Sequence, residues 1–259
     1  MEEIKDRDMP ISEVFLTDNM EYMKTIPDKF FELAIVDPPY GIGEDGRKTK
    51  GREGFVLQKN GSKRFLEAKN YKIGLYDDKP PDQSYFDKLF RISQRQIICG
   101  ENYMIFNQKQ TSTGRIVWDK VNGESDQSDC EIMWTNCIQS VRLFVYMWAG
   151  FKKAKSRMEP RTMNGNMHAV EQRIHPNHKP IEFYKDLLEN YAKAGDKIFD
   201  SHMGSQSSRI AAYQMGFDYY GCELDPDYFR DGCKRFDAVI HKRDNQEYLP
   251  AKDGSGMLF

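Results

Sequence analysis

Leu33-Ala34-Ile35-Val36-Asp37-Pro38-Pro39-Tyr40 is a short apolar run that ends in an acid, two prolines and an aromatic residue. The apolar run predicts a buried strand. Each proline fixes its own φ at about −65° and has no N–H, so the carbonyls there point out without a ladder partner. The residue before a proline is held extended, which keeps the Asp37 carboxylate forward at the carboxyl edge of the strand, where open α/β sheets bind ligands. Asp37 and the Pro38 carbonyl therefore suit the amino group of a planar ligand; a Pro-Pro turn with a surface acid is the alternative for this stretch alone.

A second strand and turn lie far downstream. Residues 197–200 (Lys-Ile-Phe-Asp) predict a short buried strand, residues 201–205 (Ser-His-Met-Gly-Ser) a turn, and residues 206–215 a helix. Backbone N–H groups and the helix dipole at such a turn face polar ligands. Glu223 ends the next predicted strand roughly 20 residues later, the spacing at which dinucleotide folds place a carboxylate on a ribose. These features predict a nucleotide-type site in which the two strand ends meet.

The segment His175-Pro176-Asn177-His178-Lys179-Pro180 lies between these two sites and precedes an amphipathic helix. Taken alone, it predicts a proline-started helix with two solvated histidines. Strands that alternate with helices predict an α/β fold with a doubly wound, mainly parallel sheet and helices on both faces. The remaining elements expected are a helix capped by Asp82 and strands at 96–99, 115–118, 131–134 and 143–148.

In these motifs and their order, the chain resembles amino-group DNA methyltransferases of the permuted β class. There Asp-Pro-Pro-Tyr comes first, His-Pro-x-x-Lys-Pro follows, and the cofactor-binding glycine turn comes last. The resemblance covers about Val14 to Phe229. It implies a circularly permuted, Rossmann-like methyltransferase sheet, S-adenosylmethionine as cofactor, and catalysis by Asp37, Pro38, Pro39 and Tyr40. The residues that it assigns to the cofactor are Asp18, Asp37, His178, Lys179, Pro180, Asp200, Ser201, His202, Met203, Gly204, Ser205 and Glu223.

Asp18 has two compatible roles. The sequence alone predicts a helix N-cap at this position, because a short acid before a helix accepts hydrogen bonds from its first N–H groups. The resemblance places Asp18 near the adenine of the cofactor.

Two stretches depart from the family's pattern. The usual turn is Asp-Pro-Phe-x-Gly-Ser-Gly, whereas Ser201 and His202 replace Pro-Phe here and Gln206 replaces the last glycine. Asn177-His178 stands where Thr-Gln is usual. Gln206 adds a side chain where the backbone approaches the ligand, so the affinity for the cofactor is harder to predict than the fold.

Length and composition fit one enzyme. The 259 residues can bury a doubly wound core as a single methyltransferase domain, 1–259. No apolar run approaches about 18 residues and the amino terminus is charged, so we expect neither a membrane span nor a secretory signal. Five scattered cysteines without a Cys-x-x-Cys pair predict reduced thiols and no metal site. With the resemblance, these features favour a cytoplasmic protein in a bacterial, phage or prophage setting.

Basic residues gather in two segments, although the net charge is −2. A glycine-punctuated segment at about 41–75 follows Tyr40 directly and is expected to be a mobile loop that closes over nucleic acid and contacts phosphates. A second segment at about 149–174 corresponds, by the resemblance, to the target-recognition region; a surface insertion is the alternative. The expected DNA-contacting residues are Lys48, Lys50, Arg52, Lys152, Lys153, Lys155 and Arg157.

The resemblance implies methyl transfer to an exocyclic amine of a flipped-out base in double-stranded DNA. An Asp at the first motif position favours adenine N6 over cytosine N4. The chain has no Pro-Cys pair, and so lacks the thiolate nucleophile that ring-carbon methylation of cytosine requires. Cytosine N4, RNA and a protein amide stay open as targets, as does a catalytically silent DNA-binding subunit. A homodimer and a restriction endonuclease partner are compatible with the resembled class.

Overall fold

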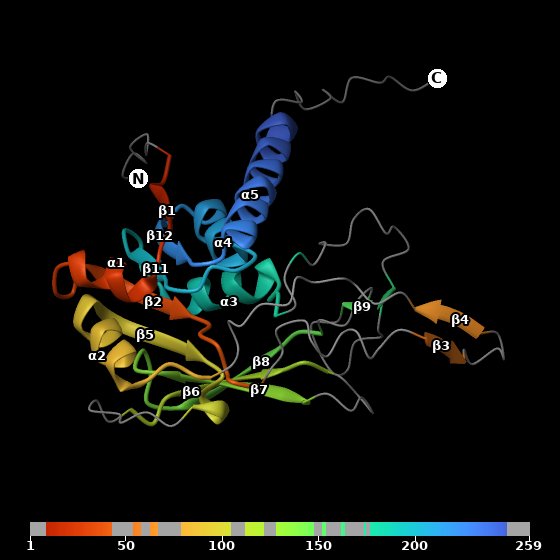
Figure 1. Cartoon of the computed structure of the whole chain (residues 1–259), viewed down its shortest axis with the longest axis horizontal. Coiled ribbons are helices and arrows are strands. Elements are labelled where there is room, and N and C mark those ends of the chain that lie inside the picture. The colour runs from red at the N-terminus through yellow and green to blue at the C-terminus, as the bar shows by residue number, and fades with distance from the viewer. Residues whose placement is uncertain are drawn as a thin grey trace, which may run out of the picture.

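The computed structural model describes residues 9–42, 79–104, 112–121, 128–147, 174 and 177–247, and the backbone of four short strands at 54–57, 63–66, 152–153 and 162–163. Its centre is an eight-stranded sheet with the order β1-β12-β11-β2-β5-β7-β6-β8 (Figure 1). These strands are β1 (Ser12–Leu16), β2 (Phe31–Val36), β5 (Ser93–Cys99), β6 (Arg115–Asp119), β7 (Cys130–Thr135), β8 (Val141–Val145), β11 (Lys197–Asp200) and β12 (Asp218–Glu223).

The strand directions confirm a doubly wound, mainly parallel sheet. β1, β12, β11, β2 and β5 are parallel neighbours, whereas β7 runs antiparallel between β5 and β6, and β8 lies parallel to β6 at the edge. The chain moves outward from β2 to β5 and, on the other side, from β11 to β12. The winding therefore reverses between β11 and β2, and ligands of open α/β sheets bind at the carboxyl ends beside such a reversal.

Helices cover both faces of the sheet, as the sequence predicts. α1 (Asn19–Thr25) and α2 (Gln83–Ile92) pack on one face. α3 (Ile181–Tyr191) and α4 (Ser207–Gln214) pack on the other, where α5 (Pro226–Glu247) contacts α4 (Figure 1).

Strand β2 shows how the sequence builds these two layers. Leu33 and Ile35 enter the core under α3 and α4, whereas Ala34 and Val36 enter the core under α1 and α2. All four are at most 1% exposed. A strand buried on both faces is apolar throughout rather than alternating, which explains the continuous run before Asp37.

Two predicted helix caps are confirmed. Asp18 accepts hydrogen bonds from the backbone N–H of Met20 and Glu21 at 2.7 and 3.1 Å. Asp82 accepts from Ser84 N at 2.9 Å and from Tyr85 N at 3.4 Å. Such caps each contribute about 1 kcal/mol to a helix. The strand expected at 143–148 begins and ends earlier, as β8 at Val141–Val145, because its pairing partner β6 runs from Arg115, opposite Val141, to Asp119, opposite Val145.

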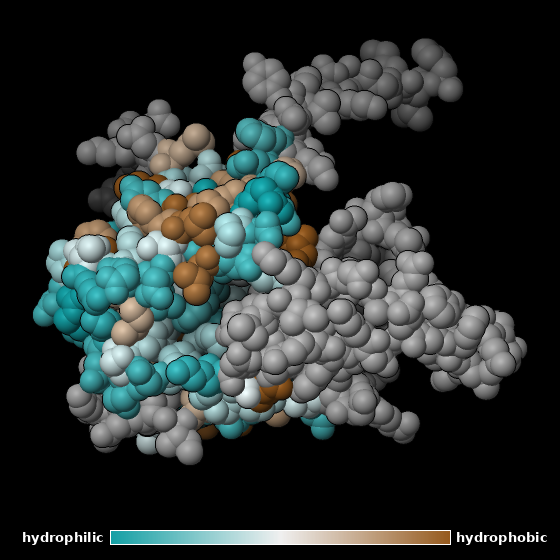
Figure 2. All heavy atoms as spheres, in the orientation of Figure 1, coloured by the Kyte–Doolittle hydropathy of each residue, from teal (hydrophilic) through white to brown (hydrophobic). Residues whose placement is uncertain are grey.

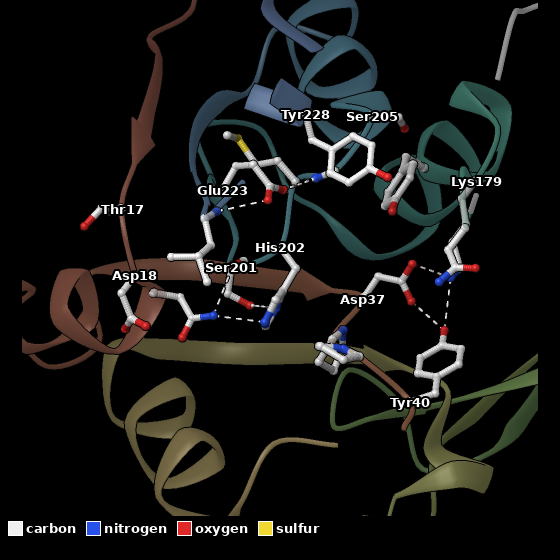
Figure 3. A pocket seen from close by; sticks show the side chains of 18 residues that line it. Thr17, Asp18, Asp37, Tyr40, Lys179, Ser201, His202, Ser205, Glu223 and Tyr228 are labelled. Carbon is white, nitrogen blue, oxygen red and sulfur yellow. Dashed lines mark hydrogen bonds and ion pairs between the residues drawn. The ribbon is translucent and has the colours of Figure 1, made fainter. Parts of the chain in front are cut away.

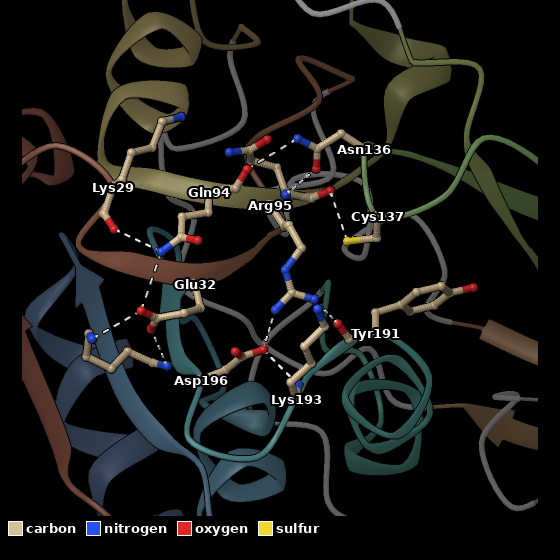
Figure 4. Close-up of polar contacts among 11 residues, drawn as sticks. Lys29, Glu32, Gln94, Arg95, Asn136, Cys137, Tyr191, Lys193 and Asp196 are labelled. Carbon is tan, nitrogen blue, oxygen red and sulfur yellow. Dashed lines mark hydrogen bonds and ion pairs between the residues drawn. The ribbon is translucent and has the colours of Figure 1, made fainter.

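A polar network connects the amino ends of the central strands, at the end of the sheet opposite the carboxyl ends where ligands are expected (Figure 4). Arg95 of β5 pairs with the buried carboxylate of Asp196 and donates to the Tyr191 carbonyl at 2.5 Å. Asp196 also accepts from Lys193 N at 2.7 Å, and Glu32 of β2 accepts from Lys197 N at 2.9 Å. The end of α3 and the start of β11 are thereby fixed to β2 and β5.

Two antiparallel strand pairs lie outside the main sheet: β3 (Gly54–Leu57) with β4 (Lys63–Leu66), and β9 (Lys152–Lys153) with β10 (Thr162–Met163). They fall within the basic segments at about 41–75 and 149–174, most other residues of which lie outside the described ranges. The loop, the recognition insertion and the single-domain organisation stay predictions. The five cysteines are free thiols, as predicted. None of the described helices combines the length and hydropathy that crossing a bilayer requires.

Apolar side chains gather on the surface over the edge formed by β1 and β12, whereas the surface around α1 is mainly hydrophilic (Figure 2). The large exposed apolar residues of this edge are Met9, Ile11, Leu16 and Leu224. Leu16 and Leu224 lie at the carboxyl ends of β1 and β12, which is the end of the sheet where ligands are expected.

Candidate active site

The carboxyl ends of four adjacent parallel strands surround one cavity (Figure 3). Residues 37–40 enter it after β2 and residues 201–205 after β11, so the two predicted strand ends meet. The end of β12 contributes Glu223, and the chain after β1 contributes Asp18. Lining residues that the sequence analysis leaves unassigned are Thr17, Asn19, Asn177, Tyr184, Leu224 and Tyr228.

Asp37 is the centre of a buried hydrogen-bond network at this cavity. Lys179 Nζ donates to Asp37 Oδ2 at 2.5 Å, and the Tyr40 hydroxyl donates to Asp37 Oδ1 at 2.5 Å. Burial, the largest influence, raises the pKa of Asp37, while the Lys179 ammonium opposes that rise. A carboxylate removed from water in this way is a strong acceptor for an N–H group brought to it.

Tyr40 is held in place by the turn after β5. Its ring stacks on Tyr103 with 5.1 Å between centroids and 14° between planes. Gly100, which begins this turn, has a φ of +72°, and a Cβ there would lie 2.1 Å from the Tyr40 ring. Only glycine allows both the left-handed backbone and this close approach. Stacking of Tyr40 on a substrate base stays a prediction.

Glu131 also belongs to this network, although sequence reasoning does not find it. It is the second residue of β7, and because β7 is antiparallel its amino end lies at the carboxyl edge of β5 and β6. Glu131 Oε1 accepts from the Tyr40 hydroxyl at 2.7 Å and lies 3.0 Å from Lys179 Nζ, while Oε2 lies 3.1 Å from Lys120 Nζ. The available signal was an acid at the start of an otherwise apolar strand.

Asp37, Cys99 and Glu131 place three ligand-type atoms within 4.8 Å of one another. The Lys179 ammonium already lies against both carboxylates, at 2.5 and 3.0 Å, and supplies the positive charge that a metal ion would bring. Burial raises the pKa of the Cys99 thiol well above its usual value, which disfavours the thiolate form that metals bind. We assign no metal to this group.

The turn after β11 is closed by Glu223. Glu223 Oε2 accepts from Gly204 N at 2.8 Å, and Oε1 accepts from Leu224 N at 3.0 Å and Asp225 N at 2.9 Å. These bonds hold the turn against the end of β12. Because each carboxylate oxygen has two lone pairs, Oε2 can also accept a hydrogen bond from a ligand hydroxyl in the cavity.

Gln206, which replaces a family glycine, keeps the glycine-like backbone with a φ of 59°. Its side chain is fully buried, but beneath α5 and not in the cavity. Nε2 donates to the Phe229 carbonyl at 3.2 Å, and Oε1 accepts from Arg209 Nη1 at 2.9 Å. A Cβ at Gly232 of α5 would lie 2.7 Å from this side chain. The substitution therefore takes no space from a cofactor.

Ser201 and His202, the other two replacements in this turn, build a hydrogen-bond chain between three elements. Asn19 Nδ2 lies 2.9 Å from His202 Nε2, His202 Nδ1 lies 2.8 Å from Ser201 Oγ, and Ser201 Oγ lies 2.6 Å from the Tyr85 hydroxyl. Asn19 Nδ2 also donates to the Ser201 carbonyl at 3.4 Å, so the amide acts as donor and the neutral imidazole donates from Nδ1. Burial lowers the pKa of His202 to about 4 and keeps the ring neutral.

Three of the residues assigned to the cofactor do not line the cavity: Asp200, His178 and Pro180. Asp200 accepts from Ser208 Oγ at 2.6 Å and His202 N at 3.0 Å, and burial raises its pKa to about 7. His178, which its own segment alone predicts to be solvated, is buried, and its Nε2 lies 3.2 Å from Ser207 Oγ at the start of α4. These contacts position the turn and the helix, and direct contact of the three residues with a cofactor stays a prediction.

The expected DNA contacts lie largely outside the described residues. This applies to Lys48, Lys50, Arg52, Lys155 and Arg157, while Lys152 and Lys153 form β9, whose side chains are not described. All seven stay predictions.

Comparison with known proteins points to one family. The family model N6_N4_Mtase, described as DNA methylase, matches residues 31–234. YubD of Escherichia coli (strain K12), a methylase by name, is 36% identical over 76 residues, which is 29% of this chain and only 31% of YubD.

Two solved structures have a similar fold. The M1.HpyAVI–SAM complex has a TM-score of 0.50 at 14% identity, over 86% of this chain and 98% of that one. TTHA0409 from Thermus thermophilus has a TM-score of 0.50 at 17% identity, over 89% of this chain and 96% of its own. At these identities the likeness concerns the fold.

Proposed function

The chain belongs to the N6/N4 DNA methylase family, and from this premise we propose that it methylates adenine N6 in double-stranded DNA, with S-adenosylmethionine as the methyl donor. The observation that carries the proposal is the single cavity shared by Asp37 and the Gly204 turn. One strand end supplies acceptors for an amine, and the other supplies a nucleotide-type turn with an acid beside it.

The charge of the cavity supports this cofactor. Among the residues that the structure describes, three carboxyl groups line it, from Asp18, Asp37 and Glu223, against one ammonium, that of Lys179, and the His202 ring is neutral. S-adenosylmethionine carries a sulfonium, an ammonium and one carboxylate, so its net positive charge suits this lining. When bound, it supplies an activated methyl group.

Residues at the cavity can be assigned to parts of the cofactor. Glu223 would accept hydrogen bonds from the ribose hydroxyls, and Asp18 together with the exposed side chain of Leu224 would contact the adenine. The turn around Gly204 would face the methionine part. Gln206 points away beneath α5, which supports an enzyme over a silent DNA-binding subunit.

Asp37 and the Pro38 carbonyl would prepare the target amine. The lone pair of adenine N6 is delocalised into the ring, which makes the amine a poor nucleophile. Two acceptors that bind its N–H groups favour a pyramidal nitrogen and concentrate the lone pair on it. These hydrogen bonds strengthen as the nitrogen becomes positive, so they lower the barrier more than they stabilise the bound substrate. The methylated nitrogen then releases one proton, to Asp37 or to water.

The target base must leave the DNA helix to reach Asp37. We assign stacking on the extruded base to Tyr40 and phosphate contacts to the basic segments at about 41–75 and 149–174. Phosphate contacts provide sequence-independent affinity, whereas recognition of a site needs base contacts from the second segment.

Mass spectrometry of nucleosides tests this function directly. DNA is incubated with the protein and a deuterated-methyl donor, then digested. We expect labelled N6-methyldeoxyadenosine with the wild type and with Asp28→Ala, which replaces an exposed acid that does not line the cavity, and none with Asp37→Ala. Labelled N4-methyldeoxycytidine alone would move the target to cytosine, and no labelled nucleoside from a folded protein that binds the donor would refute the proposal.

A further inference from the structure

Glu131 has no part in the proposed chemistry so far, yet it shares both hydrogen-bond donors of Asp37. The Tyr40 hydroxyl lies 2.5 Å from Asp37 Oδ1 and 2.7 Å from Glu131 Oε1. The Lys179 ammonium lies 2.5 Å from Asp37 Oδ2 and 3.0 Å from Glu131 Oε1. Figure 3 shows Asp37, Tyr40 and Lys179 pointing toward one another at the cavity.

A hydrogen count shows that the two acids compete. A tyrosine hydroxyl has one hydrogen and can fully donate to only one of two carboxylates. The ammonium has three hydrogens, and its neighbours Asp37 Oδ2, Glu131 Oε1 and the Tyr40 oxygen lie within 3.0 Å. While both donors point at Asp37, each of its oxygens already accepts a hydrogen bond, and an incoming amine must compete for the remaining lone pairs.

We propose that Glu131 is a positioning residue that takes over the Tyr40 hydroxyl and the Lys179 ammonium when Asp37 turns to the substrate amine. No covalent bond changes in this exchange: the hydroxyl hydrogen moves its hydrogen bond from Asp37 Oδ1 to Glu131 Oε1. The inference rests on the proposed function and deepens it, since it explains how Asp37 becomes available to an amine inside a closed network.

The charges around Glu131 suit this role. Burial, the largest influence, would raise the pKa of Glu131, but Lys179 and Lys120 together hold it at about 2, so Glu131 stays ionised. Lys120 contacts Oε2, on the opposite side from the shared donors, at 3.1 Å. The carboxylate is 8% exposed, so few water molecules compete for its lone pairs. An acceptor that is always ionised can receive both donors without first losing a proton.

The pH dependence of turnover carries the test, because Asp37 must be ionised to accept the amine. Several titratable groups face Asp37 from the elements packed around it. They are Tyr40, Tyr85 from α2, Cys99 from β5, Glu131 from β7, Lys179 and Tyr184 from the α3 region, and Asp200 from β11. Within this set, Glu131 raises the pKa of Asp37 and Lys179 lowers it.

The experiment compares kcat–pH profiles of the wild type with Glu131→Gln and Glu131→Asp. With Glu131→Gln we expect kcat to fall about ten-fold or more at neutral pH. KM for DNA and the affinity for S-adenosylmethionine should stay within about three-fold of the wild-type values. The acid limb should move to lower pH, because a negative charge beside Asp37 is gone. Glu131→Asp should restore part of the wild-type kcat and should move the acid limb part of the way back to its wild-type pH.

Glu101→Gln is the matched control. The Glu101 carboxylate lies close to the same edge of the sheet, but it pairs with Arg115 and does not contact Asp37. An acid limb that stays in place with Glu131→Gln, or that moves equally with Glu101→Gln, would overturn the inference. If Glu131→Gln does not fold, Lys120→Met provides a test of opposite sign. Lys120 lowers the pKa of Glu131, so without this cation Glu131 should lose its ionised form, and with it the acceptor, at a higher pH, which moves the acid limb of kcat to higher pH. An unmoved limb in this variant would also overturn the inference. Absence of methylation by the wild type would instead refute the proposed function.

Discussion

Asp37 carries the proposed chemistry, and its replacement separates catalysis from DNA binding. We expect Asp37→Ala to lower methylation at least about a hundred-fold, because the amine loses its charged acceptor. Affinity for DNA should change by less than about three-fold, since phosphate contacts from the basic segments supply most of it. Methyl incorporation and fluorescence anisotropy with the same DNA measure the two quantities. Loss of DNA binding in this variant would contradict the assigned roles.

His202 links the stability of the fold to pH. Its pKa is about 4 in the folded protein and 6.5 when unperturbed, so the unfolded chain binds a proton first as the pH falls. The stability that goes with the neutral ring is complete above pH 6.5 and is lost as the pH falls from 6.5 to about 4, by up to about 3 kcal/mol.

We therefore expect His202→Phe, which restores the family residue, to lose less stability between these two pH values than the wild type. Urea unfolding at several pH values measures the difference. Asp200, with a pKa of about 7, acts in the opposite direction but is present in both proteins, so it largely cancels. Parallel stability curves for the two proteins would show that the imidazole is not buried as described.

At the level of single residues, prediction from sequence depends on where a residue lies along its strand. Asp37 follows a parallel strand and Glu223 ends one. The general rule that ligands bind at the carboxyl ends of parallel strands therefore identifies both. Glu131 begins a strand, and it reaches the same edge only because β7 is antiparallel. The direction of β7 is set by tertiary pairing, which the local sequence does not encode.

The junction of α4 and α5 depends on a compensating pair, Gln206 and Gly232. Alanine in the middle of a helix is normally more stable than glycine by about 1 kcal/mol. Here a Cβ at Gly232 would lie 2.7 Å from the buried Gln206 side chain, so we expect Gly232→Ala to destabilise by about 1–3 kcal/mol.

The effect of Gly232→Ala on the free energy of unfolding should change sign when Gln206 is first replaced by glycine, because the obstructing side chain is then gone. Chemical denaturation of the wild type, both single variants and the double variant provides the cycle. A Gly232→Ala effect of the same size and sign in both backgrounds would mean that the two residues do not contact each other.

Most elements follow from local patterns, and the exceptions have physical causes. The run before Asp37 and the caps Asp18 and Asp82 are encoded locally, and each forms where predicted. The start of β8 depends on pairing with β6, and the long α5 carries a glycine in its middle, which a sequence pattern treats as a helix breaker.

At the scale of the whole molecule, the order of the motifs was enough to predict that two distant strand ends meet. The reversal of winding between β11 and β2 places them side by side. The placement of the two basic segments was not predictable in the same way, because their sequences have no apolar period that predicts how they pack.

DNA binding by the segment at about 41–75 is tested by its salt dependence. Replacing Lys48, Lys50 and Arg52 together by glutamine should reduce the slope of log affinity against log salt by about 2–3, since each lost phosphate contact removes about one released counterion. Anisotropy titrations over a range of salt concentrations measure the slope. An unchanged slope would locate the phosphate contacts elsewhere.

The central claim is that the cavity at the carboxyl ends of β11 and β2 binds S-adenosylmethionine, and calorimetric titration with this compound tests it most directly. We expect saturable binding to the wild type, retention of that binding in Asp28→Ala, and a loss of about ten-fold or more in Glu223→Ala, whose side chain closes the turn at Gly204. No heat of binding to the folded wild type at millimolar S-adenosylmethionine would contradict the account.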